Sequence, residues 1–144
     1  MAAATEQPQY NPYTKRYEYA PKGATLQYNP YRKQRELVGP GDVVVVEAPT
    51  YDRTLLSLTK LGAEVLAIPL EADGIDVGAL EAALEEGAPP KLAHIIPNFQ
   101  NPAGYTLSGP KREALVGLAR EHGFTIFEDD PYVSIRFAGE PLPT

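Results

Sequence analysis

Polar and aromatic residues stand directly after three apolar runs of the chain, in the segments 47–51, 97–104 and 128–132. The first segment ends in a tyrosine, the second is rich in Asn, Gln, Pro and Gly, and the third holds three acids followed by Pro and Tyr. Asn, Pro and Gly end a strand and form a tight turn. An apolar run that leads polar side chains into such a turn is typical of the ligand-binding edge of an open α/β sheet.

Four side chains of these segments could together bind a flat heteroaromatic ring that carries an anionic oxygen. Tyr51 offers a face for stacking, Asn101 and Tyr132 offer hydrogen-bond donors to the ring oxygen, and Asp129 offers a carboxylate to a protonated ring nitrogen. Each residue also has an ordinary structural interpretation. Tyr51 could belong to the core, Asn101 to a turn, and Asp129 with Asp130 to a helix cap or a solvated pair. Taken together, the four residues favour the ring-binding interpretation.

Alternating strand-like and helix-like segments must position these residues. Short apolar or β-branched runs predict strands at 43–46, 64–69, 91–96 and 124–127. Between them, leucines at helical spacing predict three helices. The first ends before Gly62. The second begins after a cap at Asp76 and ends before Gly87, and the third begins after a cap at Ser108 and ends before Gly123. This order predicts an α/β fold, a three-layer sandwich with a mostly parallel sheet and helices on its faces.

The first 36 residues differ in composition and are expected to form a Tyr/Pro-rich irregular N-terminal segment (1–36) ahead of an α/β domain (37–144). They hold six of the nine tyrosines, four prolines and the pentapeptide QYNPY twice, at 9–13 and 27–31. Neither helical nor alternating periodicity is present. Two interpretations stay open: a flexible or degenerate tail, which is favoured, and an aromatic, basic arm that stacks on single-stranded nucleic acid.

Composition excludes several classes of protein. The chain has no cysteine and two histidines, which argues against thiolate and histidine metal sites, so no metal ligand is assigned. Residues 1–36 hold six Lys/Arg and three Glu, whereas residues 37–144 hold seven basic and sixteen acidic residues, too acidic a balance for a general nucleic-acid binder. No apolar run reaches membrane-spanning length and no signal peptide is present, so we expect a cytoplasmic protein without a membrane partner.

Three ordered motifs resemble those of class I/II aminotransferases, the fold-type I enzymes that depend on pyridoxal 5'-phosphate: EAPTY at 47–51, PNFQNPAG at 97–104 and EDDPY at 128–132. The chain is most similar to the 2-aminoadipate transaminase branch and the related MocR-type regulators. The resemblance covers about residues 39–143 and implies that they are part of the large domain of such a transferase. It also implies an amino acid and a 2-oxo acid as substrates, and a homodimer.

The resemblance implies a role for each candidate residue. Tyr51 matches the aromatic that stacks on the cofactor ring, and Asn101 matches the amide that bonds the phenolic oxygen of the ring. Tyr132 shares that oxygen, and Asp129 matches the acid that keeps the pyridine nitrogen protonated. A protonated ring withdraws electrons and stabilises the carbanion formed at the substrate amino acid.

Two features of the family are missing from the sequence. None of its six lysines matches the lysine that binds the cofactor covalently, and the Gly/Ser turn that holds the cofactor phosphate is absent between Tyr28 and Arg35. We therefore assign no catalytic residue. We expect a truncated aminotransferase-like domain without efficient turnover, and self-association through sheet edges left unpaired.

The alternatives are non-enzymatic or use a different ligand. The first is a non-catalytic module that binds pyridoxal phosphate or serves assembly, related to the effector domain of a MocR-type regulator, although 1–36 show no helix-turn-helix pattern. A nucleotide hydrolase would need the phosphate-binding motif GxxxxGK[ST], which the sequence lacks, and a receiver domain would need acids where residues 47–49 read EAP.

Overall fold

A computed structural model describes residues 9–11, 16–18, 25–29, 34–87, 89–132 and 134–142, with side chains described from Val38 onward. Twelve elements follow one another in these ranges: β1 (Gln9–Asn11), β2 (Arg16–Glu18), β3 (Thr25–Asn29), β4 (Gln34–Val38), β5 (Val43–Ala48), α1 (Asp52–Leu61), β6 (Glu64–Glu71), β7 (Gly74–Ile75), α2 (Val77–Glu86), β8 (Leu92–Ile95), α3 (Gly109–His122) and β9 (Thr125–Glu128).

A five-stranded sheet in the order β7-β6-β5-β8-β9 forms the centre of the molecule. β6, β5, β8 and β9 run parallel, and only β7 pairs antiparallel, with the end of β6. The predicted mostly parallel sheet is confirmed. β5 and β6 each extend two residues beyond the predicted strands. No strand was predicted at β7, because a strand of two residues carries no periodicity by which a sequence could reveal it.

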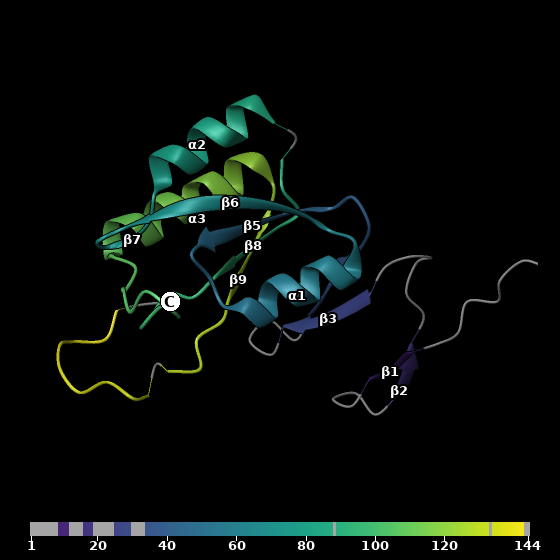
Figure 1. The fold of residues 1–144 in the computed structure, drawn as a ribbon, viewed down its shortest axis with the longest axis horizontal. Helices are drawn as coiled ribbons and strands as arrows, with labels where there is room; N and C mark the ends of the chain where they lie inside the picture. The colour runs from purple at the N-terminus through teal and green to yellow at the C-terminus, as the bar shows by residue number, and fades with distance from the viewer. Residues whose placement is uncertain are drawn as a thin grey trace, which may run out of the picture.

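Helices cover both faces of this sheet, which confirms the predicted three layers. α2 and α3 lie together on one face, and α1 lies on the other (Figure 1). Side chains of β5 alternate between the two cores, because successive residues of a strand point to opposite faces. The α2/α3 core holds Val45, Ile68, Ile75, Leu80, Leu84, Ala93, Ile95, Leu107, Leu115, Leu118 and Phe124. The α1 core holds Val38, Val44, Val46, Leu58 and Leu92.

The predicted helix ends are confirmed in position, with one difference in chemistry. Asp76 Oδ1 accepts a hydrogen bond from the Ala79 N–H at 2.9 Å, so Asp76 caps α2 as predicted. Gly62 and Gly123 end α1 and α3 in the left-handed conformation, with φ of 70° and 75°. Ser108 stands at the N-cap position of α3, but the prediction that it caps the helix is wrong, because its hydroxyl donates to Asp73 Oδ2 at 2.9 Å instead.

The expectation that residues 1–36 are irregular is wrong for the described strands. β1 pairs antiparallel with β2, and β3 pairs antiparallel with β4, as two separate two-stranded sheets. Both copies of the repeat start with a Gln paired to a Glu nine residues later, Gln9 with Glu18 and Gln27 with Glu36. The aromatic-arm interpretation concerns side chains that the structure does not describe. Most of the interval between Tyr28 and Arg35, where the phosphate-binding turn is missing, also lies outside the described residues.

No helix in the described ranges has the length and apolar character needed to cross a lipid bilayer.

Candidate functional site

The candidate site lies at the carboxyl ends of β5, β8 and β9. From β5 the chain crosses to β6 on one side, and it later returns to β8 on the other side of β5. Ligands of open α/β sheets bind where successive crossovers diverge in this way, just beyond the carboxyl ends of the strands. Tyr51 follows β5, Asn101 follows β8, and Asp129 and Tyr132 follow β9. The sheet topology therefore brings all four predicted residues to the same edge of the sheet.

Tyr51 and Asp129 line one hollow, which we call the Asp129 hollow. It has a volume of about 380 Å³ and lies between α1 and the strands β8 and β9. Tyr51 is 39% exposed, so the interpretation of this residue as core is wrong. The Asp129 side chain is 38% exposed. An accessible aromatic ring and an accessible carboxylate in one hollow can stack on a cationic heteroaromatic ring and pair with it.

His94 supports Asp129 from within the sheet. The His94 Nε2 atom lies 3.5 Å from Asp129 Oδ2 and 3.4 Å from Thr54 Oγ1. Its ring is buried and stacks on Phe127, with 5.5 Å between the centroids and 24° between the planes. Sequence reasoning treated His94 only as part of a buried strand. The available signal was an imidazole within an otherwise apolar run.

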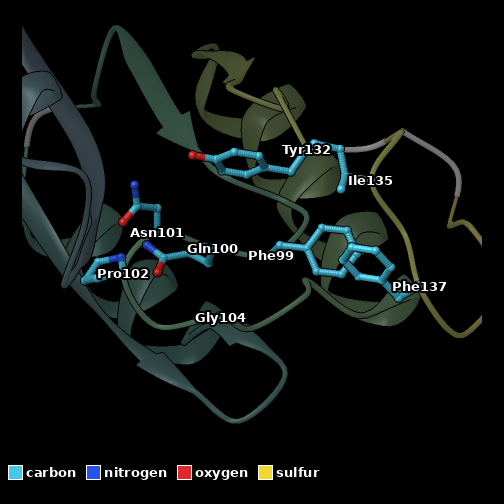
Figure 2. Close-up of a pocket in the computed structure, with 8 residues that line it drawn as sticks. All are labelled: Phe99, Gln100, Asn101, Pro102, Gly104, Tyr132, Ile135 and Phe137. Atoms are coloured by element: carbon cyan, nitrogen blue, oxygen red, sulfur yellow. The ribbon is translucent and has the colours of Figure 1, made fainter.

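Asn101 and Tyr132 line a second hollow of about 520 Å³, the Asn101 hollow (Figure 2). The Tyr132 hydroxyl and the Asn101 amide lie toward one end of the view, and the apolar side chains of Phe99, Ile135 and Phe137 toward the other. Tyr132 is 37% exposed. A hollow with phenol and amide groups at one end and apolar groups at the other can accept a ligand with a polar edge and an apolar part.

A compact turn presents Asn101. The Gln100 N–H donates to the Tyr105 carbonyl at 2.7 Å, and the Gln100 Oε1 atom accepts from the Ala103 N–H at 2.8 Å. Gly104 has a φ of 77°, a conformation that residues with a Cβ rarely adopt. The dense Asn, Pro and Gly content of 97–104 therefore forms a tight turn, as predicted.

The two hollows described above hold the four predicted residues as two pairs. Tyr51 and Asp129 share one hollow, and Asn101 and Tyr132 share the other. The segment from Asp129 to Tyr132 contributes to both hollows.

A buried polar network holds the ends of β8 and β9 together. Asn98 Nδ2 donates to Asp130 Oδ2 at 2.7 Å, while Asn98 Oδ1 accepts from Arg112 at 3.2 Å and from Arg136 at 3.3 Å. Asp130 is therefore neither a helix cap nor a solvated acid, and that alternative is wrong. Burial lowers the pKa of Arg112 and raises the pKa of Glu128. This network fixes the segment from which Asp129 and Tyr132 project.

The described residues contain no group of three or more histidine, aspartate or glutamate side chains arranged to hold a metal ion. The accessible donor set at the strand ends consists of an aromatic face, a carboxylate, an amide and a phenol. This set fits a planar organic ligand.

Comparison with known proteins gives consistent matches. A family model described as aspartate amino-transferase matches residues 32–141. Aromatic-amino-acid aminotransferase 1 of Thermococcus litoralis is 42% identical over 112 residues, which are 75% of this chain and 27% of that protein. The HTH-type transcriptional regulator YjiR of Escherichia coli is 42% identical over 94 residues, 65% of this chain and 20% of the regulator.

A solved structure also matches most of the chain. LysN of Thermus thermophilus, an α-aminoadipate aminotransferase complexed with N-(5'-phosphopyridoxyl)-L-leucine, has a TM-score of 0.69 and 33% identity. The match covers 74% of this chain and 27% of LysN. The chain therefore spans about a quarter of the length of the aminotransferases that it matches.

Proposed function

Because the chain belongs to the aspartate amino-transferase family, we propose that it forms the cofactor-ring-binding portion of an aminotransferase that depends on pyridoxal 5'-phosphate. The observation that carries the proposal is the accessible Asp129 carboxylate, which lies in a hollow that Tyr51 also lines. The His94 Nε2 atom contacts the Oδ2 atom of this carboxylate. The substrates proposed for the whole enzyme are an amino acid and a 2-oxo acid.

The chemistry of the donor set fits this cofactor. The Tyr51 ring would offer a stacking face, and the Asp129 carboxylate would favour the protonated pyridine nitrogen by charge-assisted hydrogen bonding. The Asn101 amide and the Tyr132 hydroxyl would hold the phenolic oxygen of the ring. These two residues line the adjacent Asn101 hollow, so their role requires the ring to reach both hollows.

When bound, the cofactor supplies an electron-withdrawing ring that stabilises negative charge at the α-carbon of an amino acid. The contribution of this chain is to orient the ring and to keep its nitrogen protonated. His94 supports the second task, because its Nε2 atom lies beside the Asp129 Oδ2 atom and restrains the carboxylate.

The similarity to YjiR does not favour a regulatory role for this chain. An aminotransferase and this regulator each match more than half of the chain. The matched residues therefore support cofactor binding in either setting.

Titration of the full chain with pyridoxal 5'-phosphate tests the proposal, with binding followed by absorbance and by circular dichroism of the bound cofactor. We expect saturable binding that Asp129→Asn weakens by about ten- to a hundredfold, the loss that accompanies removal of a hydrogen bond to a charged group. Glu81→Gln is the matched control, since it makes the same charge change on an exposed residue of α2. Absence of binding, or equal binding by Asp129→Asn and the control, would contradict the proposal.

A further inference from the structure

A carboxyl and a carboxamide meet in the interior between the two loops that carry site residues. Glu47, near the end of β5, is 1% exposed, and Gln100, next to Asn101, is 2% exposed. The Glu47 Oε2 atom accepts from the Gln100 Nε2 at 3.2 Å and from the Ile96 N–H at 3.1 Å. Fifty-three residues separate the two side chains, so the contact joins the end of β5 to the turn after β8.

Gln100 extends this contact to both loops. Its Nε2 atom also donates to the Pro49 carbonyl at 2.8 Å, two residues before Tyr51. Its Oε1 atom accepts from the Ala103 N–H at 2.8 Å, two residues after Asn101. One amide side chain is therefore hydrogen-bonded to the loop that presents Tyr51 and to the turn that presents Asn101.

Burying the ionisable Glu47 side chain costs desolvation free energy. Burial raises the pKa of Glu47 to about 7, against the opposing effects of the Ile96 N–H, the Gln100 amide and His94. An apolar side chain would pack in such a position without this desolvation cost. Fully satisfied buried polar groups, in contrast, fix relative orientation, because each hydrogen bond is directional and a misaligned one is expensive.

We propose that Glu47 and Gln100 are positioning residues, whose buried hydrogen bonds hold the Tyr51 loop and the Asn101 turn in a fixed relative orientation. The importance of that orientation for a ligand rests on the proposed function. The geometric role itself concerns only the chain and can be measured without cofactor.

Backbone ¹⁵N relaxation of the cofactor-free full chain tests the proposal. Gln100→Met keeps the length of the side chain and removes both hydrogen-bonding groups. We expect the order parameters of Tyr51 and Asn101 to fall from about 0.85, typical of a rigid backbone, to below about 0.6, while strand residues stay rigid. The backbone N–H groups of Tyr51 and Asn101 are not hydrogen-bonded to the Gln100 side chain. A fall in the order parameters of both residues therefore reports on the positioning of their loops.

Two further variants separate positioning from general stability. Asp76→Ala removes the cap of α2, which lies outside both loops, and should leave Tyr51 and Asn101 ordered. Glu47→Gln retains an acceptor for the Ile96 and Gln100 donors and should also keep both residues ordered. Unchanged order in Gln100→Met, or an equal loss in Asp76→Ala, would overturn the proposal. Loss of order in Glu47→Gln would overturn the assignment of the Glu47 role to its hydrogen-bond acceptor.

Cofactor titration of the same variants links the two proposals and keeps them distinguishable. If the unmodified chain binds pyridoxal 5'-phosphate, Gln100→Met should weaken binding about tenfold or more, and Glu47→Gln by no more than about twofold. Absence of binding to the unmodified chain would reject the proposed function, while the relaxation data would still decide whether Gln100 positions the loops. Tight binding to Gln100→Met despite disordered loops would show that the cofactor does not depend on this orientation.

Discussion

The carboxyl group of Glu47 has almost no access to water, and this makes the stability of the chain depend on pH at the scale of one residue. Burial raises its pKa to about 7 from the ordinary 4.5, although two hydrogen-bond donors and His94 favour the ionised form. A raised pKa means that the folded chain binds the proton more tightly than the unfolded chain does. The resulting stabilisation is complete below pH 4.5 and is lost as the pH rises through 7.

Glu47→Gln removes this titration, so its unfolding free energy should lose the part of the pH dependence that Glu47 causes. The contribution is on the order of 3 kcal/mol, because a difference of one between the folded and unfolded pKa values corresponds to about 1.4 kcal/mol. Urea unfolding between about pH 4.5 and pH 8 should therefore give two curves whose difference changes by up to this amount. Glu81→Gln, exposed on α2, should track the unmodified chain. A constant difference between Glu47→Gln and the unmodified chain would contradict the raised pKa.

The sequence predicted which positions would lie at the carboxyl ends of the strands, because each candidate follows an apolar run whose end is marked by turn residues. It could not predict the partners of those positions. His94 lies 35 residues from Asp129 in sequence, and Glu47 lies 53 residues from Gln100, so both contacts depend on strand order and register. The exposure of each side chain and the hollow that it lines were also not predictable, because both depend on how segments distant in sequence pack together.

At the scale of elements, the polar residues at the N-cap positions of α2 and α3 make different hydrogen bonds. Asp76 Oδ1 accepts from the Ala79 N–H and so satisfies one free donor of α2. Ser108 occupies the same position on α3, but its hydroxyl donates to Asp73, which also pairs with Lys111 at 2.7 Å. Ser108 thus belongs to a contact between α3 and the turn after β6.

Asp76→Ala should lower the unfolding free energy by about 1 kcal/mol, the usual value of an N-cap hydrogen bond. Ser108→Ala should cost less than about 0.5 kcal/mol, because it loses an exposed hydrogen bond and leaves the helix donors as they were. Urea denaturation near neutral pH measures both. Equal losses in the two variants would mean that the Ser108 hydroxyl caps α3 in solution.

Helices and parallel strands were predictable because their patterns are long and periodic. Val43–Val46 reads as a strand buried on both faces, and Gly62 and Gly123 mark helix ends through the left-handed conformation. The short strands were not predictable. β7 has two residues, and the strands β1 to β4 have three to five, too few for alternation to stand out among prolines.

At the scale of the whole molecule, the sheet has β9 as one of its edges, opposite the edge that β7 and the unpaired part of β6 form. In the part of the chain that the structure describes, β9 pairs with β8 alone. The Thr125 and Asp129 N–H groups donate toward β8, to the Lys91 and Ile95 carbonyls. Because donors alternate along a strand, the N–H groups of Ile126 and Glu128 point away from β8. Such an edge is a template for pairing with another chain.

We therefore expect the chain to self-associate through β9 as its concentration rises. Sedimentation velocity across about a hundredfold range of concentration should show a growing dimer or larger species, and amide hydrogen exchange should locate the contact. The Ile126 and Glu128 amides should gain protection with concentration, whereas Thr125, already bonded within the sheet, should not change. A single species of monomer mass at every concentration, with fast exchange at both outward amides, would mean that β9 stays unpaired. Association without added protection at Ile126 and Glu128 would place the contact on another surface.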